Sequence, residues 1–167
     1  MKKSLIALLL AMTLVIGLLS GCGAKPAETT QPAVDLPDLE TLYNQGMEVL
    51  AQMGDDAPIL FPETNIDYIN NFYVGLADIE LKQFYAGVAP VTNAPFEIIL
   101  VEVANAEDVP TVLEIFQARV DRETDDTAYP ENAEAWLNNC KITSRGNYVF
   151  LAVLMGSCEI PAEFILD

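Results

Sequence analysis

The 167-residue sequence contains no histidine, the commonest general base and transition-metal ligand in proteins. This absence excludes serine–histidine and cysteine–histidine nucleophile pairs. Only three cysteines are present, at positions 22, 140 and 158, and without imidazole they cannot complete a typical zinc site. No glycine-rich phosphate loop occurs either. The sequence therefore assigns no catalytic residue, no metal ligand and no cofactor.

Basic residues are also scarce. The chain has 8 lysines and arginines against 25 aspartates and glutamates, a formal charge of −17. Two of the lysines lie within residues 1–21, so the chain from Cys22 onward carries a formal charge of −19. Because like charges repel, this balance excludes a nucleic-acid partner and docking of the folded part on anionic lipid. We interpret the acidity as a solvated surface; binding of cations or basic partners is the alternative.

Residues 1–21 have the organisation of an export signal. Lys2 and Lys3 precede a nearly continuous apolar run from residue 5 to residue 19, about 15 residues long. That is shorter than the roughly 20 residues that a membrane-spanning helix needs. Leu19-Ser20-Gly21-Cys22 follows, and it resembles the lipobox of bacterial lipoproteins, in which the cysteine thiol receives a diacylglyceryl group before cleavage in front of it. We therefore expect lipid on Cys22 and a protein held at the outer face of the cell membrane.

The rest of the chain divides into two parts. Residues 22–35 are small, polar and proline-bearing, which predicts a flexible tether behind the lipid. Residues 36–167 are enough for a single acidic domain with one core. We see no internal repeat within it.

The first half of the domain should contain one helix and two strands. Apolar residues at helical spacing predict a helix over 37–53, and residues 57–65, with two prolines, predict a loop. The stretch 66–73 is compatible with a short helix or with the start of a strand. Alternation predicts a strand over 79–87. The run 96–103 is apolar on both faces at its centre, so we place it inside the sheet.

The second half should add a long helix, a hairpin and a closing helix. Asn105 or Asp108 can cap a helix that has Pro110 in its first turn and ends at 123–126. A helical turn over 131–136 comes next. Strands over 140–144 and 148–155 then flank a turn, and a short helix over 161–166 ends the chain. The predicted class is α+β: an antiparallel sheet of about four strands packed with helices, in the order α-β-β-α-β-β-α.

Over about residues 75–165 the chain resembles a family of small Gram-positive lipoproteins with a domain of unknown function. The resemblance rests on short segments in a common order, ahead of an acidic end helix: Phe96-Glu97-Ile98-Ile99-Leu100, Ala118-Arg119-Val120-Asp121, Tyr129-Pro130 and Gly146-Asn147-Tyr148-Val149-Phe150-Leu151. It implies a fold and a location but no activity. Cys140 and Cys158 are not part of that family pattern.

Two pairs of residues are candidates for structural roles. Glu97 lies in an apolar strand and Arg119 near the edge of an apolar helical stripe, where a lone charge is costly. We therefore expect Glu97, or alternatively Glu102, to form a structural ion pair with Arg119. Outside the cytoplasm Cys140 and Cys158 can form a disulfide. The sequence leaves that pairing open, because a bridge requires Cα atoms about 4.4–6.8 Å apart.

Acidic clusters and aromatic residues were the other candidates for a site. None of the clusters has the spacing of a calcium loop, so we interpret them as solvated turns: Asp55-Asp56, Glu107-Asp108 and Glu123/Asp125/Asp126. Trp136 with Tyr129 could form an aromatic patch for a partner, although a lone tryptophan beside a hairpin is more often part of the core.

The favoured hypothesis is a non-enzymatic, lipid-anchored module of the cell envelope that binds another envelope protein or a small ligand. The alternative is an envelope hydrolase that relies on carboxylates. An enzyme should have a cleft that holds two or more carboxylates. A binding module should instead have an exposed apolar patch or an open sheet edge.

Overall fold

The computed structural model describes residues 36–90, 94–125, 128–156 and 158–166. The export signal, Cys22 and the tether predicted over 22–35 all lie outside these residues. The compact unit that holds the described residues spans Gln31–Asp167. Within the described part, no helix combines the length and the hydropathy that a membrane crossing requires.

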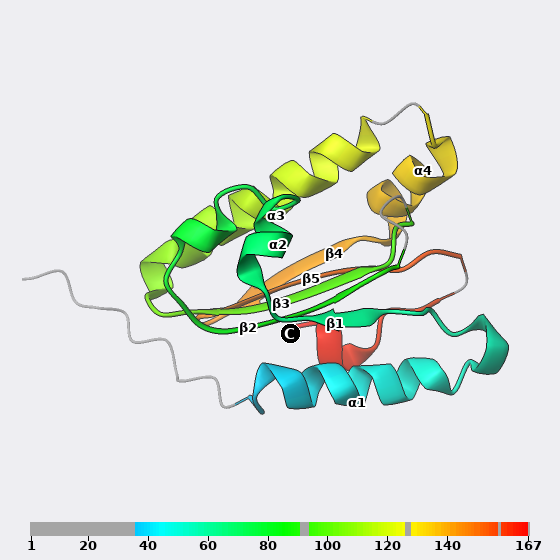
Figure 1. Cartoon of the computed structure of the whole chain (residues 1–167), viewed down its shortest axis with the longest axis horizontal. Coiled ribbons are helices and arrows are strands. Elements are labelled where there is room, and N and C mark those ends of the chain that lie inside the picture. Colours follow the sequence, from blue (N-terminus) through cyan, green and yellow to red (C-terminus); the bar gives the residue numbers. More distant parts are fainter. Residues whose placement is uncertain (1–35, 91–93, 126–127, 157, 167) are drawn as a thin grey trace, which may run out of the picture. The chain divides into compact units, whose positions relative to one another are not determined.

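The described residues form a five-stranded antiparallel sheet and four α-helices (Figure 1). The strand order is β1-β2-β3-β5-β4, which places β3 and β5 in the interior. The strands are β1 (Phe61–Glu63), β2 (Leu81–Val88), β3 (Glu97–Val103), β4 (Lys141–Arg145) and β5 (Tyr148–Val153). The helices are α1 (Leu39–Ala51), α2 (Ile66–Asn70), α3 (Val109–Thr124) and α4 (Pro130–Asn139), and the 3-10 turn η4 (Ala162–Phe164) follows the last strand. The predicted α+β class is therefore confirmed.

The sheet has two covered faces (Figure 1). Alternate residues of a strand point to opposite faces, so the apolar residues of β3 contribute to both. Ile99 and Val101 pack under α2, α3 and α4, and we call this side the α3 face. Ile98 and Leu100 pack under α1 and η4, and we call this side the α1 face. The run that the sequence placed inside the sheet lies there because both of its faces are buried.

Local signals explain where the helices begin. The carboxylate of Asp38 caps α1 by accepting a hydrogen bond from the Thr41 backbone N–H at 2.9 Å. The side chain of Asn65 caps α2 in the same way, through the N–H of Asp67 at 3.0 Å. Pro110 lies in the first turn of α3, where a missing N–H is tolerated.

Several sequence-based boundaries need correction. The loop expected over 57–65 contains strand β1, which pairs with β2 through Phe61–Val88 and so raises the strand count from about four to five. Residues 66–70 are helical, which settles the open alternative for 66–73. The helical turn expected over 131–136 is the longer helix α4, and the closing helix expected over 161–166 is only the turn η4.

Candidate functional site

A buried carboxylate lies at the start of the central strand. Glu97 is the first residue of β3 and points to the α3 face, and only 8% of its surface is exposed. Its strand neighbours across the sheet are Val88 and Val153. A charge among such residues is strongly unfavourable unless it is paired and hydrogen-bonded. Its partners therefore decide whether the strand can hold it.

Arg119 of α3 supplies the opposite charge. Its Nη2 donates to Glu97 Oε1, and its Nε donates to Glu97 Oε2 at 3.4 Å. Its Nη1 donates to Glu123 Oε1, one helical turn along α3. Burial alone would lower the pKa of Arg119, but the charge and hydrogen bond of Glu97 outweigh it and raise that pKa above its ordinary value. The structure thus forms the Glu97–Arg119 pair, and Glu123 joins it.

Three aromatic rings enclose the guanidinium group of Arg119. Its central carbon lies 5.0 Å from the ring centroid of Trp136, 5.5 Å from that of Phe72 and 5.8 Å from that of Tyr73. These distances are within the range of cation–π attraction. Trp136 is 2% exposed, so the tryptophan of α4 is core and does not form an aromatic patch with Tyr129.

Tyr73 is the third partner of the carboxylate. Its hydroxyl donates to Glu97 Oε2 at 2.6 Å, and the residue is 1% exposed. Asn70 at the end of α2 holds the following turn, because its Oδ1 accepts the N–H groups of Gly75 and Ala77 at 3.0 and 3.1 Å. Burial and, next, the Glu97 charge raise the pKa of Tyr73 well above its ordinary value. Tyr73 therefore remains a hydrogen-bond donor at neutral pH.

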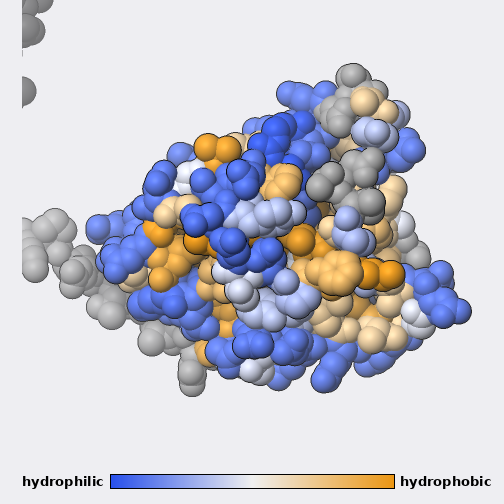
Figure 2. Space-filling model, viewed as in Figure 1, coloured by the Kyte–Doolittle hydropathy of each residue, from blue (hydrophilic) through white to orange (hydrophobic). Residues whose placement is uncertain are grey.

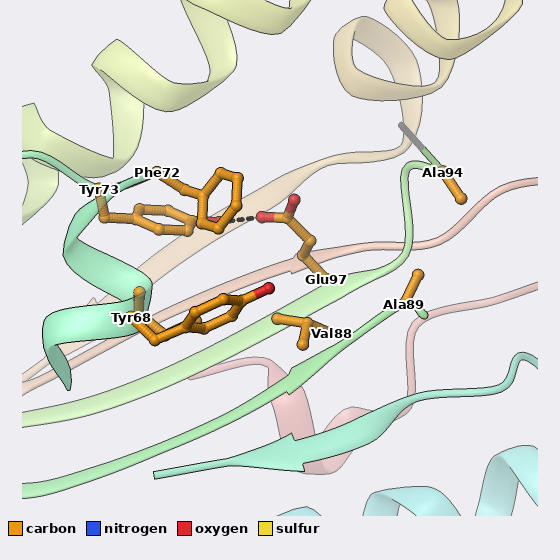
Figure 3. Close-up of a pocket in the computed structure, with 8 residues that line it drawn as sticks. Tyr68, Phe72, Tyr73, Val88, Ala89, Ala94 and Glu97 are labelled. Atoms are coloured by element: carbon orange, nitrogen blue, oxygen red, sulfur yellow. Dashed lines mark hydrogen bonds between the residues drawn. The ribbon is translucent and has the colours of Figure 1, made fainter. Parts of the chain in front are cut away.

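A small pocket opens beside this carboxylate (Figure 3). Its volume is about 20 Å³, slightly more than the roughly 10–15 Å³ that one water requires on the same measure. In Figure 3 the rings of Phe72 and Tyr73 lie beside the Glu97 carboxylate, and the ring of Tyr68 lies nearby. The pocket is lined by residues of α2, the turn after it, and β2 and β3: Tyr68, Ile69, Phe72, Tyr73, Val88, Ala89, Ala94 and Glu97. Glu97 is the one carboxylate in this lining.

The groups around the pocket are poorly suited to proton transfer or nucleophilic attack. Both oxygens of Glu97 already accept hydrogen bonds. The Tyr73 hydroxyl is held in its protonated form, because burial and the Glu97 charge raise its pKa. Burial and then the Glu97 charge raise the pKa of the nearby Cys140 thiol to about 12, so a thiolate is scarce at neutral pH.

The disulfide considered for Cys140 and Cys158 does not form. Both cysteines are free thiols. Cys140 packs against the α3 face, whereas Cys158 packs against the α1 face, so the sheet lies between them. The Sγ of Cys158 is instead 3.9 Å from the backbone oxygen of Asp56.

Glu102, the alternative partner for Arg119, has a different role. Its Oε2 accepts from Gln83 Nε2 at 2.7 Å, and its Oε1 lies 3.5 Å from Lys82 Nζ. Gln83 Oε1 in turn accepts the N–H of Leu39 at 3.0 Å, so the side chain links the start of α1 to the sheet.

The acidic clusters provide no metal site among the described residues. No group of three carboxylates or thiols there lies close enough to hold an ion. Asp55 and Asp56 are exposed in a 3-10 turn, and Glu123 is used by Arg119. Asp126 lies outside the described residues.

A second, wider hollow lies along α4. Its volume is about 250 Å³. Two carboxylates of α4, Glu131 and Glu134, line it. The other lining residues are neutral: Ala135, Asn138, Asn139, Met155 and Gly156. It differs from the pocket at Glu97 in having two carboxylates and no aromatic wall.

Tyr68, Phe72 and Tyr73 were not expected at the site from the sequence, and Glu123 was considered only as part of a solvated acidic cluster. Tyr68 and Phe72 are separated by four positions, which is the spacing that brings side chains together on a helix, and their rings meet edge-to-face at 5.7 Å. The same spacing joins Arg119 to Glu123. Local spacing was therefore an available signal for these pairs, whereas nothing local connects Tyr73 to Glu97.

Comparisons with known proteins place the chain in one family. No curated protein and no solved structure matches it. A family model does match, over residues 63–154, which is more than half of the chain. The match runs from the last residue of β1 through β5, so it includes the buried cluster and the pocket but not α1 or η4. The chain therefore belongs to the family described as a domain of unknown function (DUF4358).

Proposed function

We propose that this protein is a lipid-anchored binding module of the cell envelope that acts without catalysis. The observation that carries the binding role is the pocket beside Glu97. It combines aromatic walls with a single carboxylate whose two oxygens already have partners. A pocket of this size can hold one small group of a ligand, but it has no free acid–base pair with which to transform it.

Exposed apolar residues near the pocket support the same role. Tyr68 is 41% exposed and Phe61 is 55% exposed. Phe61 pairs with Val88, which lines the pocket, so this apolar surface continues from the pocket to the sheet edge. Figure 2 shows apolar atoms in a band at the level of the strands, with hydrophilic atoms on both sides of it. Such a surface is typical of an interaction site.

The anchoring role rests on the N-terminal sequence. Lys2, Lys3, the short apolar run and Leu19-Ser20-Gly21-Cys22 occur in the order that lipid attachment requires. The proline-bearing residues 23–35 would then separate the domain from the membrane surface. An acidic domain benefits from such a spacer, because anionic lipid headgroups would repel it.

The anchoring proposal is tested by cell fractionation. The full chain and its Cys22→Ala variant are expressed in a Gram-positive host, and membrane and medium fractions are compared. We expect the wild-type protein in the membrane fraction and the variant either in the medium or as an uncleaved precursor. Cys158→Ala is the matched control and should stay membrane-bound. Equal membrane retention and equal processing of all three forms would contradict the proposal.

The binding role is tested by crosslinking in intact cells, followed by purification of the lipidated protein. We expect an adduct that is lost when Tyr68 is replaced by alanine and retained when exposed Tyr129 is replaced. Recovery of no adduct, or of the same adduct from both variants, would argue against binding at the pocket.

A carboxylate-dependent hydrolase is the second candidate, favoured by the hollow along α4. Glu131 and Glu134 lie three positions apart on the helix, a spacing that places both side chains on one face of α4. Most glycosidases use a pair of carboxyl groups, one as general acid and the other as nucleophile or general base. Incubation of the protein with isolated cell-wall polysaccharide should then release reducing sugar, and Glu131→Gln should abolish the release. Equal release by Glu131→Gln and wild type would remove this candidate.

A further inference from the structure

We infer that the pocket beside Glu97 binds the ammonium head of a protonated primary amine. This inference rests on the proposed binding function and specifies its ligand class. The size of the pocket supports this ligand class. The pocket offers about 20 Å³, which suits one group as large as a water molecule. A primary ammonium group has that size, whereas a trimethylammonium group is considerably larger.

Glu97 has a free acceptor position for an ammonium group. An ionised carboxylate offers about four lone-pair positions. Among the described residues, Oε2 accepts from Tyr73 and from Arg119 Nε, while Oε1 accepts only from Arg119 Nη2. Glu97 itself lines the pocket. Oε1 therefore keeps a lone pair that no described residue uses, and the side chain that carries it lines the pocket.

The aromatic lining of the pocket also suits a cation. Tyr68, Phe72 and Tyr73 all contribute to the walls. The faces of aromatic rings attract cations, by roughly 0.5–1 kcal/mol at exposed sites and about 2 kcal/mol where water is excluded. Figure 3 shows the rings of Phe72 and Tyr73 beside the Glu97 carboxylate and the ring of Tyr68 nearby, so a cation in the pocket would lie close to aromatic rings and to a carboxylate.

The net negative charge around the pocket favours a cationic ligand as well. Glu97, Glu123 and Arg119 together carry one net negative charge, and the whole chain carries a formal charge of −17. Both favour the approach of a cation. Arg119 would oppose it, but Arg119 does not line the pocket, and its guanidinium group is enclosed by Phe72, Tyr73 and Trp136.

The experiment is a titration of the full lipidated chain in nonionic detergent, followed by NMR of the tyrosine ring signals. The probes are n-butylammonium, tetramethylammonium, n-butanol and butyrate, which separate charge from size. We expect saturable binding of n-butylammonium, and binding at least about tenfold weaker for each of the other three. Equal responses to n-butylammonium and n-butanol, or no saturation with n-butylammonium, would overturn the inference.

Variants assign the binding to the pocket. Tyr68→Ala removes one aromatic wall at a position that is 41% exposed, so the fold should tolerate it. We expect it to weaken n-butylammonium binding about 5–30-fold, the equivalent of about 1–2 kcal/mol. Tyr68→Phe should retain the affinity, and Tyr129→Ala, at an equally exposed tyrosine outside the pocket, should leave it unchanged. An unaltered affinity in Tyr68→Ala would place the binding elsewhere and refute the assignment.

Two sources can supply the same ammonium group, a free polyamine or a lysine side chain of a protein. Spermidine and a short lysine-containing peptide with blocked ends are therefore titrated in parallel, with an arginine-containing peptide as control. Tighter binding of either amine than of the arginine peptide supports the inference and identifies the source. If amines do not bind while the cellular adduct at Tyr68 persists, the ligand class is wrong and the binding function stands; loss of both rejects the binding function as well.

Discussion

The two faces of the sheet are built in different ways. On the α3 face a buried ion pair lies among apolar side chains, and its polar atoms have defined partners. On the α1 face the packing is apolar and very close, with the rings of Tyr43 and Phe164 against Gly87 and Gly46. Tyr43 is also buried, yet its hydroxyl has no hydrogen-bond partner among the described residues.

This difference shows what each face contributes. Close apolar packing stabilises a fold without directing a ligand, and it depends on shape. A buried ion pair adds little net stability compared with apolar packing, but removal of one partner is severe. The α3 face holds the paired carboxylate of Glu97 in its core, and Glu97 also lines the pocket. The following experiments test the contrast.

The largest effect is expected for Arg119→Ala. It leaves the Glu97 carboxylate buried without an opposite charge, so the free energy of unfolding should fall by about 3–5 kcal/mol in urea denaturation. The control Arg145→Ala, at an exposed arginine of edge strand β4, should change it by less than about 0.5 kcal/mol. A Glu97→Met/Arg119→Met double variant should recover most of the loss. Similar stability of Arg119→Ala and Arg145→Ala would mean that the ion pair is not formed.

A smaller effect distinguishes the two buried tyrosines. Tyr73→Phe removes a hydrogen bond to a charged group and should destabilise the protein by about 1.5–3 kcal/mol. Tyr43→Phe removes a hydroxyl without a partner and should leave stability unchanged or raise it. Thermal and urea unfolding of both variants give the comparison. A greater loss for Tyr43→Phe than for Tyr73→Phe would reverse our description of the two faces.

Gly46→Ala tests the close packing on the α1 face. A Cβ at Gly46 would lie 2.6 Å from Cε1 of Phe164, well inside van der Waals contact. Gly46→Ala should therefore destabilise the protein by about 1–3 kcal/mol, although alanine favours a helix by about 1 kcal/mol over glycine. Phe164→Leu in the Gly46→Ala background should recover part of the loss. Stabilisation by Gly46→Ala alone would show that α1 does not pack on η4 as described.

The smallest perturbation compares the two free thiols. Because burial raises the pKa of Cys140 to about 12, it should be alkylated in the native protein at pH 8 far more slowly than Cys158, and both should react alike in urea. The pKa of Cys158 is also raised, first by burial, so it should react more slowly than a free thiol. Mass spectrometry after timed quenching measures both rates. Faster labelling of Cys140 would contradict its burial on the α3 face.

The same pKa gives a pH dependence of stability. The native state holds the Cys140 thiol neutral, whereas the unfolded chain ionises it near its ordinary pKa of 9.0. Its contribution to stability is therefore complete below about pH 9 and declines as the pH rises toward about 12. Cys140→Ala should reduce that decline.

The fold was predictable where the apolar pattern was strong. The interior strand expected over 96–103 and the helix expected up to 123–126 match β3 and α3 to within a few residues. Strand β1 was not predictable, because Phe61-Pro62-Glu63 is short and contains a proline. It becomes a strand only through pairing with β2, which local sequence does not encode.

The site was predictable only in part. The pair of Glu97 and Arg119 could be predicted from the sequence, because each is a charge in an apolar context. Tyr73 could not be added, since it comes from another segment and meets Glu97 only after folding. The sequence left the Cys140–Cys158 disulfide open for a related reason: an oxidising compartment allows a bridge, but only the folded chain decides on which face each cysteine packs.

The position of Phe164 against Gly46 also has a consequence for the order of folding. These residues belong to α1 and to η4, so the α1 face cannot close until the chain has been synthesised as far as residue 164. Until then, Ile98, Leu100 and Phe150 remain without the cover of η4. An exported chain would pass through a stage in which the α3 face is packed and the apolar α1 face is still exposed. During that stage it would depend on chaperones or on rapid completion to avoid aggregation.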